Sequence, residues 1–321
     1  MEQTDGNPAS SIFTSFLAPG IDRCAFIASW LRARKIPHTV VDLAGKKHIV
    51  VRFASESYDG RFRIKTLVAH YDRADGTPGA NDNSAACFQL MLLAERLASF
   101  APTRTSSRAE ACEKHNVRIF FTDGEEAAGT KGIAGQGSFA LGSGLRKLKM
   151  TGDDVYVFDA CGRGDTLILS TAGMNKTGAM GERLIKLHER SAEIARAAAS
   201  ENWMRLHTPY SDNAGFLASG IASQVFTVLP HAEAATLELA LKRECAPNES
   251  ENDPQAKKML ESALTKNQHT IGSVESLDPA IPHTWKLMHT ANDSADTLTA
   301  QAFILMRKLL DEITKRKDIA R

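Results

Sequence analysis

The chain has 321 residues, with 39 Lys and Arg, 38 Asp and Glu, and a formal net charge of +1 when its 10 histidines are counted as neutral. This balance argues against a nucleic-acid-binding protein, which needs a concentrated basic face. Hydrophobic residues at 43% and charged residues at 24% are ordinary values for a globular protein and exclude wholesale disorder.

The N-terminal residues lack the features of a secretory signal, because acids come early and no basic region precedes an apolar stretch. No run of 18 apolar residues occurs, so no membrane span is expected. Five scattered cysteines without a CxxC pair favour free thiols in a reducing compartment. We therefore expect a cytoplasmic protein with no membrane or nucleic-acid partner, and the sequence does not indicate its oligomeric state.

Helix-like and strand-like segments alternate along the chain. In order, the pattern predicts a helix over 20–34, strands over 38–43, 47–53 and 62–69, a helix over 84–98, strands over 117–122 and 155–159, a helix over 181–199, a strand over 222–229 and a helix over 299–315 with Thr299 as its cap. Such alternation predicts an α/β three-layer sandwich, with helices on both faces of a mixed, mostly parallel central sheet.

Two polar segments interrupt this alternation. Residues 101–116 are small and polar and read as a surface loop. Residues 231–280 hold nine acids and five bases and contain two helix-like pieces, at 235–243 and 254–266. We expect a single catalytic domain over 1–321, with 231–281 as an insertion or flap within it. The alternative is an ordinary solvated connection that carries two surface helices.

The first candidate site residues follow the strand at 62–69. Residues two apart on an extended chain share a face, so Asp72 can contact the imidazole of His70 and fix its tautomer. Ten residues further on, the turn Pro78-Gly79-Ala80-Asn81-Asp82-Asn83 opens a helix and places Asp82 at its mouth. Asp82 could serve as a helix cap, as a metal ligand, or as both.

Acidic residues also follow two other apolar strands. Glu125 and Glu126 come after the strand at 117–122, and Asp159 comes directly after VYVF. Adjacent side chains diverge, so one glutamate can bind a metal while the other stays free as a base, as metal-assisted hydrolysis requires. His289 precedes an acidic loop and the last helix.

These residues form a set that can hold two divalent ions. Its members are His70, Asp82, Glu126, Asp159 and His289. If Asp82 bridges, each ion receives three protein ligands and keeps an open position, as catalytic zinc sites do. The three carboxylates would offset most of the charge of two zinc ions.

The order and spacing of these motifs resemble the M28 family of zinc aminopeptidases. The intervals are 12 residues from His70 to Asp82, 44 to Glu126, 33 to Asp159 and 130 to His289. The stretch Tyr210-Ser211-Asp212-Asn213 is similar to the Ser-Asp-His stretch of the family. The resemblance covers about residues 60–316, and the first 55 residues match only loosely, as a helical lead-in.

The resemblance implies a phosphorylase/hydrolase-like zinc exopeptidase fold and hydrolysis of the N-terminal bond of a peptide or a small amino-acyl substrate. It implies that His70, Asp82 and Asp159 hold one zinc ion, or Co or Mn in its place, and that Asp82, Glu126 and His289 hold a second. Glu125 would be the general base and then the general acid, and Asp72 would orient His70. Three further residues would support the ligands or contact the substrate, with a cis peptide bond before the last: Asp212, Tyr210 and Asn83.

Three alternatives remain beside this interpretation. Glutaminyl cyclases are related and use one zinc, and Trp285, four residues before His289, matches their Trp-His segment in part. M20 and M42 peptidases use a similar ligand order but need an inserted domain for which this chain has too little room. A catalytically silent binding module is disfavoured, because all five ligands and Glu125 are present. Asn213, where many M28 members have His, puts only the substrate range in doubt.

Overall fold

The structure is a computed structural model that describes residues 10–99, 114–126, 129–245 and 280–320. Its centre is an eight-stranded sheet of order β1-β2-β4-β3-β5-β8-β6-β7. The strands are β1 (His38–Leu43), β2 (Lys46–Arg52), β3 (Lys65–His70), β4 (Val117–Thr122), β5 (Asp154–Phe158), β6 (Thr166–Ser170), β7 (Trp203–Leu206) and β8 (Ser223–Leu229). Strands β4, β3, β5 and β8 are parallel neighbours, whereas β1, β2 and β6 add antiparallel pairs. The predicted mixed sheet is therefore confirmed.

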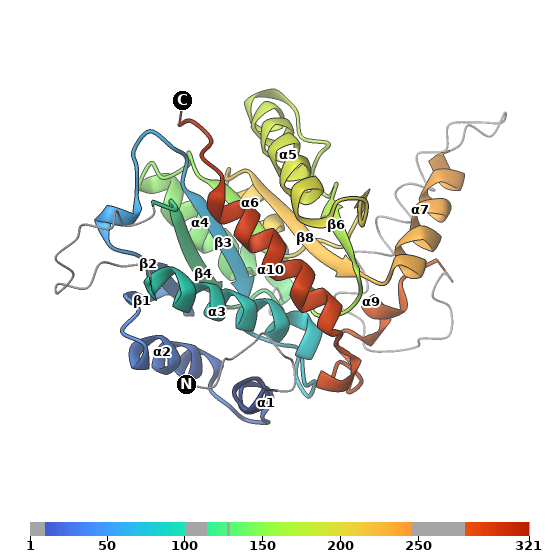
Figure 1. Ribbon diagram of the computed structural model, residues 1–321, viewed down its shortest axis with the longest axis horizontal. Helices are drawn as coiled ribbons and strands as arrows, with labels where there is room; N and C mark the ends of the chain where they lie inside the picture. Colours follow the sequence, from blue (N-terminus) through green and yellow to red (C-terminus); the bar gives the residue numbers. More distant parts are fainter. Residues whose placement is uncertain (1–9, 100–113, 127–128, 246–279, 321) are drawn as a thin grey trace.

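Helices cover both faces of this sheet (Figure 1). They are α1 (Ser11–Leu17), α2 (Arg23–Ala33), α3 (Ala85–Ser99), α4 (Gly137–Lys147), α5 (Gly178–Ala199), α6 (Asn213–Ala218), α7 (His231–Cys245), α9 (His283–Leu287) and α10 (Ala300–Lys315). On one face α3, α5 and α10 build the larger apolar core, and on the other α4 and α6 build a smaller one. The predicted three-layer α/β sandwich is confirmed.

Strand β3 shows why the central strands read as unbroken apolar runs. Leu67 and Ala69 pack in the core under α3 and α10, whereas Val68 packs in the core under α4 and α6. All six residues of β3 are buried. Because both faces are covered, every position excludes water, and the alternation of polar and apolar residues that marks a half-exposed strand is lost.

The chain reverses direction across the sheet at β3. It passes from β3 through α3 to β4 on one side, and then through α4 to β5 on the other side of β3. In open α/β sheets, the crevice at such a switch point, beyond the carboxyl ends of the strands, is where ligands bind. The carboxyl end of β3 is therefore the first place to look for a site.

Short elements and one glycine-rich helix were not predicted. Strands β6 and β7 and helices α1, α6 and α9 have four to seven residues, too few to show a clear period. Helix α4 contains Gly137, Gly142 and Gly144, which lower helix propensity, and the sequence pattern therefore gave no helix there. Gly142 has a packing role, since an added Cβ there would overlap Ser219 at the end of α6.

Thr299 stands at the N-cap of α10, as predicted, but its side chain does not cap the helix. Its hydroxyl accepts the amide hydrogen of Gly164 at 2.9 Å and lies 2.9 Å from the carbonyl oxygen of the same residue. The amide of Thr299 donates to the carbonyl of Gly162. The start of α10 is thereby attached to the loop that follows β5.

Helix α7 occupies the beginning of the predicted insertion. Its residues Ala234 and Leu237 are buried against Ile168 of β6 and Leu206 of β7. Residues 246–279 of that segment, with the predicted helix at 254–266, lie outside the described residues, as do residues 101–113 of the predicted loop. The flap therefore stays a prediction. Within the described part of the chain, no helix combines the length and the apolar composition needed to cross a membrane.

The close contact between α4 and α6 makes a stability prediction. A Cβ added at Gly215 of α6 would lie 2.5 Å from the backbone nitrogen of Phe139, and closer still to the Ser138 hydroxyl. We expect Gly215→Ala to lower the free energy of unfolding by about 1–3 kcal/mol in urea titrations. Gly144→Ala in α4, where a Cβ meets nothing within 4 Å, is the control and should raise it by about 0.5–1 kcal/mol. Equal effects of the two substitutions would contradict the packing argument.

Candidate metal centre

The predicted site residues gather at the carboxyl ends of β3, β4 and β5. His70 is the last residue of β3 and pairs with Thr122, the last residue of β4. Glu125 and Glu126 follow β4 closely, and Asp159 follows β5 directly. The parallel register therefore brings residues from three separate segments to one edge of the sheet.

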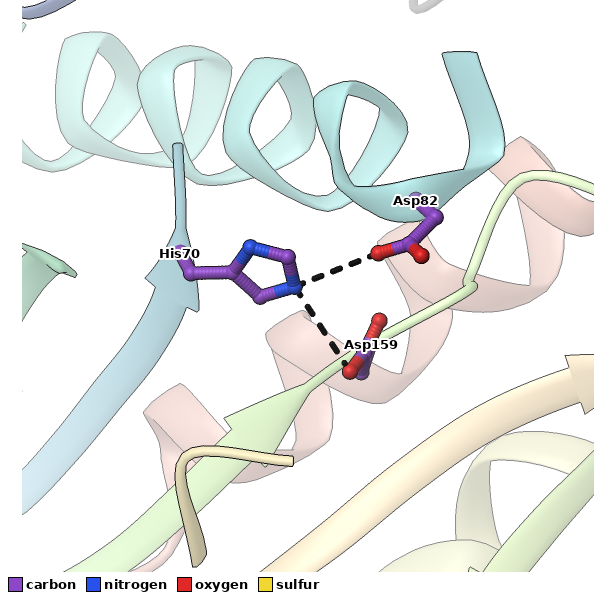
Figure 2. A group of neighbouring side chains, drawn as sticks. All are labelled: His70, Asp82 and Asp159. Atoms are coloured by element: carbon purple, nitrogen blue, oxygen red, sulfur yellow. Dashed lines mark ion pairs between the residues drawn. The ribbon is translucent and has the colours of Figure 1, made fainter. Parts of the chain in front are cut away.

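His70 is fully buried at the centre of this group. Its Nε2 lies 3.3 Å from Oδ1 of Asp82 and 3.7 Å from Oδ2 of Asp159 (Figure 2). Its Nδ1 lies 3.5 Å from Oδ1 of Asp72. Since good N–H···O hydrogen bonds span about 2.7–3.2 Å, these contacts are too long to satisfy the ring nitrogens. Each of the two ring nitrogens is therefore turned toward carboxylate oxygens but makes no normal hydrogen bond with them.

Asp82 is shared between the two histidines. While Oδ1 faces His70, Oδ2 lies 3.1 Å from Nε2 of His289, and the same nitrogen lies 3.0 Å from Oε2 of Glu126. Asp82 sits in the turn Ala80–Ser84 that opens α3, and its peptide bond to Asn83 is cis, as the sequence led us to expect. One carboxylate thus faces two separate groups of ligand atoms.

Three groups of side chains could each hold a cation. In each, nitrogen and carboxylate oxygen atoms all lie within 4.8 Å of one another; the groups are His70–Asp82–Asp159, Asp82–Glu126–His289 and His70–Glu125–Glu126. The first two share Asp82 and together contain all five predicted ligands. The structure therefore brings the predicted ligands together in two overlapping sets.

Unpaired polar atoms test whether these residues suit a metal. Among the described residues, both ring nitrogens of His70, Oε1 of Glu126 and Oδ1 of Asp159 are buried without a hydrogen-bond partner. Buried polar atoms are nearly always paired, so unpaired ones that converge on one place require an explanation. Imidazole nitrogen and carboxylate oxygen are the donors that zinc and similar divalent ions accept. The residues fit a centre of one or two divalent cations.

Glu125 lies beside the ligands but has a different environment. Its side chain is buried, and Nε2 of Gln136 donates a hydrogen bond of 3.2 Å to its Oε1. Burial, followed by the charges of Glu126 and Asp159, raises the pKa of Glu125 well above the usual value for a glutamate. A carboxyl group with a raised pKa can take and return a proton near neutral pH.

Other pKa values reflect the concentration of charge. Contacts with Asp82 and Glu126 raise the pKa of His289 to about 11. Burial, with smaller effects from neighbours, raises the pKa of Asp212 to about 6. Burial raises the pKa of Asp82 too, but contacts with His289 and His70 outweigh it, and the net pKa of Asp82 is below the usual range. The carboxylates around Asp82 strongly favour a bound positive charge.

Asp72 connects two parts of the site. Its Oδ1 faces His70, and its Oδ2 accepts the backbone amide hydrogen of Glu126 at 3.0 Å. The position of Asp72 therefore affects both His70 at the end of β3 and Glu126 after β4. This placement agrees with the orienting role that we expected for Asp72, and it adds a link to a second predicted ligand.

Asp293 was missed by the sequence reasoning. It is 1% exposed, and its Oδ1 and Oδ2 accept the backbone amide hydrogens of Asn81 and Asp82 at 2.8 and 3.0 Å. Its own carbonyl oxygen accepts the amide hydrogen of Ala80. It holds the turn of Asp82 from a position four residues after His289. The only sequence signal was its place in the acidic loop that follows His289.

The pocket next to the ligands is partly open to solvent. Four of the five predicted ligands and Glu125 line one wall. The other lining residues are Gln136, Ala160, Thr208, Pro209, Tyr210, Ser211, Val225, Thr227, Ile281, Trp285 and Met288. Tyr210 lines this pocket, and among the described residues the lining side chains beyond the acids and His289 are neutral.

The other predicted residues lie below the pocket. Asp212 is fully buried, and Thr122 donates a hydrogen bond of 2.5 Å to its Oδ2. Asn83 is buried and donates to the carbonyl of Phe158, next to Asp159. Asn213, where His was expected, accepts the amide hydrogen of Ser211. These three side chains support the backbone around the ligands and do not line the pocket.

One protein family matches most of the chain. The model of Peptidase family M28 matches residues 49–312. A search among curated protein sequences found no match to this chain.

Several solved structures have the same fold. The LapA aminopeptidase of Legionella pneumophila superposes with a TM-score of 0.57 at 15% identity, over 96% of this chain and 70% of LapA. The glutaminyl cyclase of Bacteroides thetaiotaomicron, bound to N-acetylhistamine, gives a TM-score of 0.56 at 15% identity, over 95% of this chain and 94% of the cyclase. An aminopeptidase of Aneurinibacillus sp. strain AM-1 gives 0.49 at 16% identity over 86% of this chain, which spans only 49% of that protein.

We predict that Asp293 is needed for metal affinity. Asp293→Ala leaves two buried amide hydrogens without an acceptor and frees the turn of Asp82. We expect the affinity for Zn²⁺, measured by chelator competition, to fall about 10- to 100-fold, as for other residues that hold metal ligands. Asp296→Asn, at an exposed position in the same loop, should leave the affinity unchanged. If both variants bind Zn²⁺ as the unmodified chain does, the role of Asp293 is wrong.

We predict that Gln136 holds the carboxylate of Glu125. Gln136→Leu removes the hydrogen bond to Oε1, and hydrogen bonds to charged groups contribute about 1.5–3 kcal/mol. If Glu125 takes part in the reaction, kcat should fall about 10- to 100-fold with little change in KM. Gln136→Glu, which places a second carboxylate against Glu125, should lower kcat further. Steady-state kinetics check both, and an unchanged kcat in Gln136→Leu would contradict the assignment.

Proposed function

Since the chain belongs to peptidase family M28, we propose that it is a metal-dependent aminopeptidase that hydrolyses the N-terminal bond of peptides or small amino-acyl compounds. The observation that carries the proposal is the pair of overlapping ligand sets that share Asp82, with Glu125 beside them in an open pocket. Two cations per chain, with zinc as the first choice, suit these donors. LapA, which has the same fold, is an aminopeptidase.

His70 and Asp159 would complete one metal site with Asp82, and Glu126 and His289 would complete the other. Bound divalent cations would polarise the scissile carbonyl and make a nearby water more acidic. Glu125 lies within reach of both sites, because one of its carboxylate oxygens lies within 4.8 Å of an imidazole nitrogen of His70 and of a carboxylate oxygen of Glu126. It would take a proton from the attacking water and deliver it to the leaving amine.

The lining of the pocket also favours the amino end of a substrate. With two divalent cations bound, the carboxylates of Asp82, Glu126 and Asp159 would be largely offset, and a neutral N-terminal amine could coordinate a cation. Among the described residues, the lining contains no Lys or Arg that could bind a C-terminal carboxylate. This composition supports an aminopeptidase over a carboxypeptidase.

Glutaminyl cyclase activity is the second candidate. Trp285 lines the pocket next to Met288 and His289, and it could stack on a substrate side chain that folds back for cyclisation. The cyclase of Bacteroides thetaiotaomicron matches this chain over 94% of its own length. A cyclase would need the amine of the substrate to attack its own side-chain amide and expel ammonia, with Glu125 moving a proton from that amine to the leaving ammonia.

One set of measurements tests the proposal. Metal analysis of the zinc-loaded chain should give two equivalents, and leucyl anilides should release leucine. Glutaminyl anilides should be hydrolysed and should not yield pyroglutamate. One equivalent of zinc with pyroglutamate formation would instead support the cyclase, and neither activity with bound zinc would support a silent binding module.

The role of Glu125 has its own test. Glu125→Gln should bind zinc as the unmodified chain does but lower kcat about 10²- to 10⁴-fold, the range for loss of a general base. The bell-shaped pH profile of the unmodified chain should lose its acidic limb in the variant. Glu56→Gln, at an exposed position in the turn Ser55–Ser57, is the control and should leave kcat unchanged. Unchanged hydrolysis by Glu125→Gln would overturn the assignment.

A further inference from the structure

The N-terminal helices α1 and α2 lie outside the region that matches the family, which begins at residue 49. They nonetheless pack against the segment that carries the metal-binding turn. Phe13 of α1 is fully buried against Ala85 and Phe88 at the start of α3. In Figure 1, α1 lies below the start of α3, whereas α2 lies below its later turns. Apolar contacts alone would suffice to attach these helices to the domain, yet two arginines also make polar contacts here.

Arg23, the first residue of α2, points into the protein. It is 6% exposed, and its guanidinium lies over the ring of Phe16 at 4.6 Å. Its Nη1 donates to the backbone carbonyls of Tyr71 at 2.7 Å and Asp72 at 3.3 Å. Tyr71 and Asp72 are the two residues that follow His70. Arg23 therefore fixes the main chain of the residue whose carboxylate faces His70 and accepts the amide hydrogen of Glu126.

The buried position of Arg23 is energetically unfavourable for a charged side chain. Among the described residues, Nε and Nη2 are buried without a hydrogen-bond partner. Burial lowers the pKa of Arg23 to about 10, with Asp72 and Asp82 among the groups that oppose the shift, so the side chain stays charged at neutral pH. A methionine or leucine would fill the same space without burying a charge. The contacts to the carbonyls of residues 71 and 72 are what an apolar side chain could not supply.

Arg73 holds the same segment from the other direction. Its Nη1 donates to the carbonyls of Leu17 at 3.2 Å and Pro78 at 2.8 Å, and its Nη2 donates to the carbonyl of Ala18 at 3.3 Å. Leu17 and Ala18 are at the end of α1, and Pro78 begins the turn that carries Asp82. The segment 71–79 is thus attached to α1 by one arginine and to α2 by the other.

We propose that α1 and α2 are part of the catalytic unit, with Arg23 as a positioning residue that sets the main chain of Asp72 and, through its carboxylate, the orientation of His70 and Glu126. The proposal rests on the metal centre described above. Arg73 acts in the same way on the turn of Asp82. The N-terminal helices therefore contribute to metal affinity and turnover without contacting metal or substrate.

Arg23→Met tests the proposal, with Arg34→Met as the matched control. Arg34 lies at the other end of α2, stacks on Trp30 and pairs with Glu95 of α3 at 2.8 Å, and neither partner is a predicted ligand. We expect Arg23→Met to lower the affinity for Co²⁺ about 10- to 100-fold, to alter the visible absorption of the Co²⁺-loaded chain and to lower kcat more than it raises KM. Arg34→Met should change stability but none of these three.

Hydrogen exchange gives a readout that needs no bound metal. In Arg23→Met, peptides that cover 70–74 and 123–126 should exchange faster than in the unmodified chain, because the carboxylate of Asp72 then holds the amide of Glu126 less firmly. Arg34→Met should leave them unchanged. If the unmodified chain binds no Co²⁺, the metal centre itself is wrong, but faster exchange would still support the positioning of Asp72.

Two outcomes would overturn the proposal. One is that Arg23→Met keeps the Co²⁺ affinity, the spectrum, kcat and the exchange rates of the unmodified chain. The other concerns Arg73→Met, which replaces Arg23→Met in the same measurements if Arg23→Met does not fold. The side chain of Arg73 is partly exposed, so its replacement disturbs the fold less. A folded Arg73→Met with unchanged Co²⁺ affinity and unchanged exchange over 78–84 would show that the N-terminal helices serve stability alone.

Discussion

The close approach of several carboxylates at the end of β3 is the constraint on which the rest of this structure depends. Asp82, Glu126 and Asp159 surround two imidazoles within a few ångströms, and Glu125 and Asp72 lie next to them. Two like charges 4 Å apart repel by about 4 kcal/mol at an effective dielectric constant of 20. A single hydrogen bond contributes about 1 kcal/mol, which is less than this repulsion. Cations shared by the carboxylates would offset it, as the proposed metal centre requires.

The backbone around the ligands is held by contacts that come from distant parts of the chain. Asp293 accepts the amide hydrogens of the Asp82 turn, Asp72 accepts that of Glu126, and Arg23 donates to the carbonyls beside Asp72. In each case a charged side chain binds main-chain groups, which fixes a ligand without taking up its coordinating atoms. Ligand residues keep their oxygens and nitrogens free for metal, and their positions are set by neighbours.

This arrangement explains what sequence reasoning could and could not find. The strands β3, β4 and β5 are apolar runs that end in acids or histidine, so the local pattern predicted the sheet, its parallel centre and the ligands at its edge. Asp293 and Gln136 have no such pattern, because their roles depend on partners 212 and 11 residues away that only the folded chain brings close. Arg23 lies within the predicted helix over 20–34, and the helical pattern did not single it out. Helix α4 was missed because its glycines lower helix propensity, although Gly142 serves packing against α6.

Residues that line the pocket and one of the predicted metal ligands lie in the same short stretch of chain. Trp285 of α9 and Met288, which directly follows α9, line the pocket, and His289 is the next residue. The amide of Thr284, in the first turn of α9, donates to Glu233 of α7 at 2.8 Å, and Arg163 lies near the same carboxylate, four residues after Asp159. Any displacement of α9 therefore moves a pocket wall and a ligand together. His289 is 20% exposed whereas His70 is fully buried, so the His289 side of the centre is the one that faces solvent, and there the pocket wall and the predicted ligand cannot change independently.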